Sequence, residues 1–146
     1  MNRLRSTLII AAILALGLVL VASQVLAVQV GNDEVQFLGV RYDDPQTGQS
    51  TWFYAVTSGA QPNISHVTFQ LGDCLSVVEA GTWDGPSNFD GRDDEGVAYE
   101  LGTDPTTGVT GIKFDEPISA GDTRYYYITV DGNYAEGQIT VATKAG

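Results

Sequence analysis

The stretch TWFYAVTSGAQPNISHVTFQLGDC, residues 51–74, decides the fold of this 146-residue chain. Residues 51–57 are aromatic and β-branched, a composition that favours β-strands. After a polar loop, residues 64–71 alternate between apolar and polar side chains, the pattern of a strand with one buried face. The stretch therefore predicts two strands, which we expect to form the central hairpin of a β-rich domain.

The only His and the only Cys of the chain lie in this stretch. Alternation in the second strand places Val67 and Phe69 on one face and His66 on the more polar one. We therefore expect His66 to be a surface or hydrogen-bonded structural residue. A single Cys cannot form an internal disulfide, so we expect Cys74 to be free and buried, the alternative being a bond to another chain.

The rest of the chain repeats this strand-and-turn pattern, and no helix is predicted after the N-terminal segment. The next clearest strand is TRYYYITV, residues 123–130, followed by a hairpin signal at residues 131–133. A change of parity in EVQFLGVRY predicts a β-bulge at Leu38-Gly39. Further strands are expected within residues 34–42, 75–80, 97–101, 109–114 and 138–143.

These segments amount to about seven or eight short strands separated by turns, which indicates an antiparallel β-sandwich. Their spacing does not fix the topology, so jelly-roll, barrel and immunoglobulin-like arrangements stay open.

The first 27 residues have the features of a secretory signal peptide. Arg3 and Arg5 precede a nearly unbroken apolar run over residues 8–22, and a V-x-A pattern ends at Ala27. We expect cleavage after Ala27, which leaves residues 28–146 as a single secreted domain. The alternative is a retained membrane anchor.

The chain is acidic, with 18 Asp and Glu against seven Lys and Arg, and a formal net charge of −11. Such a charge repels nucleic acid and anionic lipid, so neither is expected as a partner. No membrane contact is expected once the signal peptide has been removed.

Motifs for catalysis are missing from the sequence. The chain has no G-x-S-x-G nucleophile elbow, and one His and one Cys rule out multi-histidine zinc sites and thiolate clusters. Most acidic residues lie in turns beside Gly or Pro, where Asp is common for backbone reasons. We therefore predict that the protein is not an enzyme and needs no cofactor, with calcium as the one open case.

The segment GTWDGPSNFDGRDDEG, residues 81–96, predicts a long acidic loop. Calcium binds six to eight oxygen ligands. Aligning the EF-hand glycine with Gly91 puts Pro86 and Val97 at the first and last ligand positions, so the loop is not an EF-hand. An irregular calcium site and a solvated loop both stay open. The candidate ligands are Asp84, Asp90, Asp93, Asp94 and Glu95, with Asn88.

Alternation in residues 123–130 directs Tyr126, Ile128 and Val130 to the core and directs Tyr125 and Tyr127 outward. With Trp52 or Phe53, the two outward tyrosines predict an aromatic surface for a sugar or a partner. The alternative is that both faces of the sheet are covered.

Several pieces of the sequence resemble a group of uncharacterised exported bacterial β-domains. They are the W-x-Y-x-V-T segment from Trp52, the I-S-H triplet ending at His66, Cys74, residues 104–115 (DPTTGVTGIKFD) and the end DGNYAEGQITVATKAG, residues 131–146. The resemblance covers nearly the whole chain after the signal peptide. It implies a secreted or surface-associated β-domain.

We therefore expect a secreted, non-enzymatic extracellular β-domain, a matrix, surface or adhesion component that acts by protein contact. Its partners would be further copies of itself, another extracellular protein or a polysaccharide. The alternative is a carbohydrate- or calcium-binding module.

Overall fold

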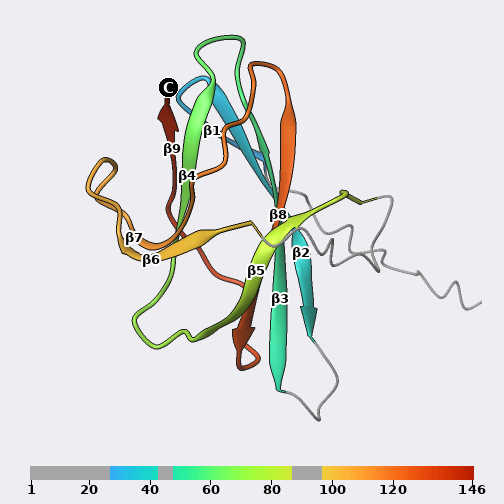
Figure 1. The fold of residues 1–146 in the computed structure, drawn as a ribbon. Helices are drawn as coiled ribbons and strands as arrows, with labels where there is room; N and C mark the ends of the chain where they lie inside the picture. Colours follow the sequence, from blue (N-terminus) through green and yellow to red (C-terminus); the bar gives the residue numbers. More distant parts are fainter. Residues whose placement is uncertain (1–26, 43–47, 87–96) are drawn as a thin grey trace, which may run out of the picture.

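The computed structural model describes residues 27–42, 48–86 and 97–146. Two antiparallel sheets form the sandwich that the sequence predicts (Figure 1). The predicted signal peptide, residues 1–27, falls outside these residues, apart from Ala27, which begins the first strand. The described residues form nine strands rather than seven or eight: β1 (Ala27–Val30), β2 (Asp33–Tyr42), β3 (Gln49–Thr57), β4 (Ile64–Gln70), β5 (Val77–Trp83), β6 (Tyr99–Thr103), β7 (Thr110–Phe114), β8 (Thr123–Asp131) and β9 (Val141–Ala145).

The five-stranded sheet has the order β1-β2-β3-β8-β5, and the four-stranded sheet has the order β6-β7-β4-β9. In both sheets, strands that are adjacent in space are often not adjacent in the chain, since β8 lies between β3 and β5 and β4 lies between β7 and β9.

The strands β3 and β4 do not form the predicted hairpin. They lie in different sheets, and the loop between them crosses from one layer to the other. In place of β4, β3 has β2 and β8 as its antiparallel neighbours. Composition predicts β3 and alternation predicts β4 correctly, but neither carries information about the partners of a strand.

The chain after β8 also departs from the prediction. The segment at residues 131–133 crosses to the other sheet, because β9 pairs with β4 rather than with β8. The strand expected over residues 138–143 begins only at Val141, which packs against the core, whereas Ile139 is exposed. Residues 133–140 form no strand and run exposed along the surface.

The core between the sheets is built around three fully buried aromatic residues, Phe69, Phe114 and Tyr126. The ring of Phe69 lies 5.6 Å from that of Tyr126 and 6.0 Å from that of Phe114. Tilted and edge-on contacts of this kind add to the stabilisation that burial provides. Tyr126, Ile128 and Val130 face this core as predicted.

The predicted β-bulge is confirmed. The register between β2 and β3 shifts between Phe37 and Gly39, which leaves Leu38 as the extra residue. Gly39 has a φ of 132°, a conformation that L side chains rarely adopt.

Candidate functional site

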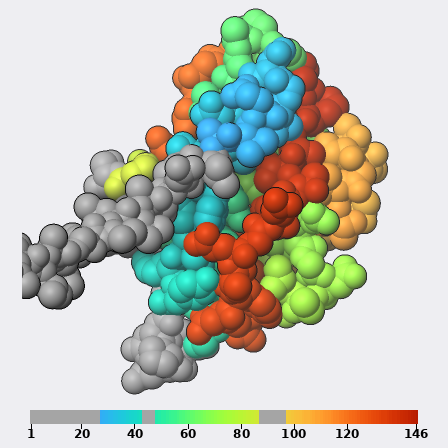
Figure 2. Space-filling view, turned by 180° about the vertical axis from the view of Figure 1, so that it is seen from behind, coloured from blue at the N-terminus to red at the C-terminus, as the bar shows by residue number. Residues whose placement is uncertain are grey.

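A small half-open pocket lies at one end of the sandwich, where the outer strands of the two sheets meet. The blue β1 and the red β9 lie side by side on the face shown in Figure 2, and the two strands are in contact. The pocket has a volume of about 250 Å³. It is lined by Val30, Gly31, Asn32, Asp33, Pro62, Thr143 and Ala145.

A tight turn between β1 and β2 builds one wall of this pocket. Val30 pairs with Asp33, so Gly31 and Asn32 form a two-residue hairpin loop. The φ of 65° at Gly31 is the left-handed conformation that such loops require. Asp33 is thereby fixed as the first residue of β2, with its side chain at the pocket.

The loop after β3 closes tightly on this turn. A Cβ atom added at Gly59 would lie 2.3 Å from the carbonyl oxygen of Asn32, so only glycine permits the approach. The approach brings the backbone N–H of Gly59 to the Oδ1 atom of Asp33, at 3.0 Å. Two segments distant in sequence therefore meet at one carboxylate.

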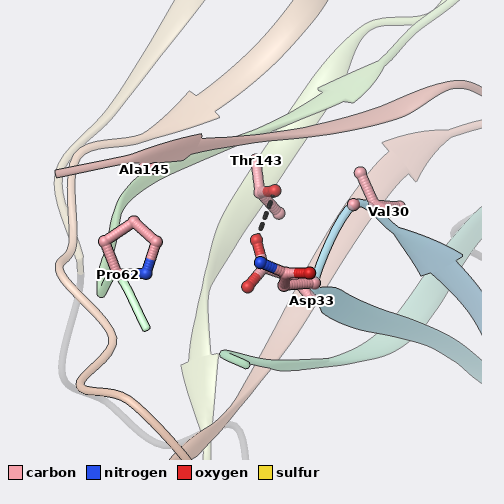
Figure 3. Close-up of a pocket in the computed structure, with 7 residues that line it drawn as sticks. Val30, Asp33, Pro62, Thr143 and Ala145 are labelled. Atoms are coloured by element: carbon pink, nitrogen blue, oxygen red, sulfur yellow. Dashed lines mark hydrogen bonds between the residues drawn. The ribbon is translucent and has the colours of Figure 1, made fainter. Parts of the chain in front are cut away.

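Asp33 is 9% exposed. Its Oδ2 atom accepts a hydrogen bond of 2.6 Å from the Thr143 hydroxyl of β9 (Figure 3). Figure 3 shows Asp33 between Val30 on one side and Pro62 on the other. The pocket thus combines one hydrogen-bonded carboxylate with a lining that includes the apolar side chains of Val30, Pro62 and Ala145.

A second polar cluster lies on the outer face of β4. The side chain of Asp104, in the turn after β6, is fully buried there. His66 Nε2 lies 3.0 Å from its Oδ2 atom, and the Thr68 hydroxyl donates to the same oxygen at 3.1 Å. Because an ionised carboxylate only accepts hydrogen bonds, His66 must donate from Nε2. His66 is therefore the hydrogen-bonded residue that its strand position predicts.

Two further donors hold the Asp104 carboxylate from within its own turn. The Thr107 hydroxyl donates to Oδ2 at 2.5 Å, and the Thr106 N–H donates to Oδ1 at 3.0 Å. The hydrogen bond from Thr107 is the largest cause that lowers the pKa of Asp104 far below its usual value, and those from Thr106, His66 and Thr68 add to it. Burial opposes this shift by disfavouring the charged form.

The surroundings of this cluster indicate a structural role. The other ring nitrogen of His66 lies 3.9 Å from Asp115, which forms an ion pair of 2.9 Å with Lys113. Both neighbouring hydroxyls, of Thr68 and Thr107, donate to Asp104. A nucleophilic triad instead needs a hydroxyl against the histidine. The cluster fastens the β6–β7 turn onto β4.

Most of the predicted acidic loop falls outside the described residues, including Asp90, Asp93, Asp94 and Glu95. Asp84 is described and is exposed. Within the described ranges, no group of three or more His, Cys, Asp or Glu side chains is placed to hold a metal ion. The calcium site stays a prediction.

The predicted exposed tyrosine surface is not what the structure shows. Tyr127 is only 2% exposed and forms a buried cluster with Phe53 and Trp83, against which Tyr125 is partly buried. The cluster lies on the face of the five-stranded sheet that points away from the core. Gly81 leaves room for the Tyr127 ring, since an added Cβ would lie 3.1 Å from it. The prediction that Tyr127 is exposed is therefore wrong, and the alternative, a covered outer face of the sheet, is found here.

The expectation that Cys74 is buried is also wrong. Cys74 is free and exposed, in the turn that precedes β5. The sequence placed it directly after a strand-breaking Gly-Asp pair, and that position already favoured a turn at the surface. A bond to another chain remains open to this thiol.

Two of the best-held polar side chains, Asp33 and Asp104, were not singled out from the sequence. Gly31-Asn32 is a recognised two-residue hairpin signal that would have placed Asp33 at the start of a strand. The partners Thr143 and His66 come from distant strands, and no local pattern indicates them.

No described helix is long and apolar enough to cross a membrane. The chain matches no protein-family model, no curated protein and no solved structure.

Proposed function

We propose that this chain is a secreted, non-enzymatic extracellular β-domain, a matrix, surface or adhesion component that acts by protein contact. The observation that carries the proposal is the end of the sandwich where β1 and β9, each an outermost strand of its sheet, flank the small pocket. We call this region, made by β1, β9 and the pocket, the contact end.

The edges of the sheets suit this role. An outermost strand presents backbone N–H and C=O groups to which another chain can add a strand. Among the described residues, β1 pairs only with β2. Its Val28 is 58% exposed, which adds apolar surface beside these groups. The pocket is smaller than the roughly 300–1,000 Å³ of most small-molecule sites, and its size suits a single protruding side chain.

Self-contact through β1 predicts association that depends on protein concentration. The weight-average mass in sedimentation should rise with concentration under reducing conditions, where Cys74 cannot form disulfides. Val28→Lys should remove most of this rise, because a charge on an edge strand opposes strand pairing. Non-reducing runs with Cys74→Ser would identify any covalent component.

The matched control for Val28→Lys is Leu101→Lys on β6. Leu101 is 59% exposed, almost as much as Val28, but β6 is the outermost strand at the other edge of its sheet from β9. Leu101→Lys should therefore leave the association unchanged. A strict monomer at all concentrations, or equal loss in both variants, would count against contact through this end.

A second candidate function, carbohydrate binding, is favoured by a pair of exposed tyrosines. The Tyr42 hydroxyl donates a hydrogen bond of 2.7 Å to the backbone oxygen of Tyr134. The Tyr134 ring lies so close to Gly132 that an added Cβ would be 2.6 Å away. Both rings are exposed and held in place, which is the arrangement that stacking against sugar rings requires.

Binding to a neutral polysaccharide tests this candidate, because the acidic chain repels anionic ones. Tyr42→Ala and Tyr134→Ala should each weaken retention in affinity electrophoresis by about tenfold, for a stacking contact of about 1.4 kcal/mol. Val78→Ala, at an exposed apolar residue elsewhere, should leave retention unchanged. A glycan array without hits would remove this candidate.

A further inference from the structure

We propose that the pocket at the contact end receives the side chain of a lysine or arginine from the partner protein, with Asp33 binding its charged group. The inference rests on the proposed contact function and names the chemistry that the contact uses. It follows from three properties of the pocket: a carboxylate without a basic partner, a size that fits one side chain, and apolar walls.

The first property is the unbalanced charge of Asp33. Both carboxylate oxygens accept hydrogen bonds, from the Gly59 N–H and the Thr143 hydroxyl, but neither donor carries a charge. No basic side chain among the described residues forms an ion pair with Asp33. A cation that enters the pocket can form a charged hydrogen bond with this nearly buried carboxylate. Such a bond is strong here, because little water reaches the carboxylate to compete for it.

The second property is size. A volume of about 250 Å³ holds a single long side chain but not a nucleotide or a typical cofactor.

The third property is the lining of the pocket. Val30, Pro62 and Ala145 offer apolar contact to the methylene stem of a lysine or arginine. Such stems bury readily against apolar surface while the charged head reaches a polar group.

Other ligand classes fit less well. The net charge of −11 and the Asp33 carboxylate both disfavour an anion. A metal ion needs several ligands, and no group of three acidic, His or Cys side chains gathers in the described part of the chain. A basic side chain needs only the one carboxylate, and each oxygen of Asp33 can accept a second hydrogen bond from it.

The test is an NMR titration of the full domain with blocked amino acids. N-acetyl-lysine methylamide and N-acetyl-arginine methylamide should shift the amide signals of Gly31, Asn32 and Gly59 saturably, with a Kd on the order of 1–10 mM. The neutral N-acetyl-norleucine methylamide has the same stem without the charge, and it should bind at least tenfold more weakly. Added salt should weaken binding of the charged probes.

Two variants test whether the probes bind in the pocket while the fold is kept. Asp33→Asn removes the charge but can keep both hydrogen bonds, because the Thr143 hydroxyl can accept as well as donate. It should weaken binding at least tenfold. Ala145→Phe fills the rim without touching Asp33 and should have the same effect. Glu100→Gln, at an exposed carboxylate on β6, should change the Kd by less than about twofold.

The outcomes are distinct. Equal binding of the lysine and norleucine probes, or unchanged binding by Asp33→Asn, overturns the proposal even if the protein associates through Val28. Loss of both probe binding and self-association in Asp33→Asn assigns the basic side chain to a second copy of the chain. Loss of probe binding with intact self-association assigns it to a different protein.

Discussion

Replacing Asp104 with alanine is expected to lower the free energy of unfolding by about 3–5 kcal/mol, the range for breaking a buried charged hydrogen-bond network. The substitution leaves four donors without their acceptor: His66 Nε2, the hydroxyls of Thr68 and Thr107, and the Thr106 N–H. His66 and Thr68 are buried, and each buried group left unsatisfied costs about 1–3 kcal/mol. Thr106 is exposed and Thr107 is half-buried, so water can replace part of what these two donors lose. Urea or guanidinium unfolding monitored by tryptophan fluorescence measures the loss.

Asp115→Ala is the matched control. Asp115 also lies near His66, but its side chain is half-exposed and its ion pair with Lys113 is at the surface. Surface pairs of this kind contribute about 0–1 kcal/mol. A loss of less than about 1 kcal/mol in Asp104→Ala, or a loss as large in Asp115→Ala, would show that the network does not hold the β6–β7 turn.

The Asp104 contribution should also depend on pH. Its pKa is lower in the folded protein than in the unfolded chain, chiefly because Thr107 donates to the charged form. The unfolded chain therefore binds a proton first as the pH falls. The stabilisation is complete above the unfolded pKa of about 3.9 and is lost as the pH falls from there toward the folded pKa.

Comparing wild type and Asp104→Ala at pH 7 and at about pH 3 tests this dependence. The difference in unfolding free energy between the two proteins should shrink at the lower pH, since the wild type loses a contribution that the variant lacks. A difference that is constant or grows as the pH falls would contradict the assigned direction of the pKa shift.

Replacing Gly111 with alanine is expected to cost about 3 kcal/mol or more, or to prevent folding. Gly111 of β7 lies opposite Gln70 of β4. An added Cβ would be 1.9 Å from the carbonyl oxygen of Phe69 and 2.7 Å from the backbone nitrogen of Leu71. These are backbone atoms of the paired strand, so relief of the clash requires the two strands to separate. The midpoint of denaturant unfolding measures the effect.

Gly137→Ala provides the comparison. An added Cβ there meets no atom within 4 Å, and the residue lies in the exposed segment before β9. Its effect should be within about 0.5 kcal/mol, since surface substitutions away from special conformations are usually neutral. If the free energy of unfolding of Gly111→Ala is within about 1 kcal/mol of the wild-type value, the close approach of β7 to β4 is not rigid.

The sequence predicted individual strands better than their partners: the pairing of β2 with β3 is as expected, but that of β3 with β4 is not. Residues 123–130 alternate clearly, and the structure confirms which side chains of β8 face the core. The same rule assigns faces to β4, but the hairpin expected between β3 and β4 does not exist. Side-chain alternation reports which face of a strand is buried, whereas pairing depends on how two whole sheets pack.

The expected functional residues show the same limit. Tyr127 points outward from the sheet as alternation requires, yet it is buried, because Phe53 and Trp83 pack beside it. A side chain that points outward from a sheet is exposed only when no other side chain covers the outer face of that sheet. The expectation for Cys74 is wrong in the opposite direction: a single thiol without an internal partner was expected to be buried, but its position in a turn exposes it.

The stretch at residues 51–74, with its strand-forming composition and alternation, determined by itself that this chain is a β protein. Local preferences between neighbouring residues suffice for that result, since the period of two is set by backbone geometry. Only the tertiary structure decided that β3 and β4 lie in different layers, that His66 meets Asp104, and that Asp33 meets Gly59 and Thr143. Each of these contacts joins segments far apart in the chain, and such contacts form only when two sheets bury their faces against each other.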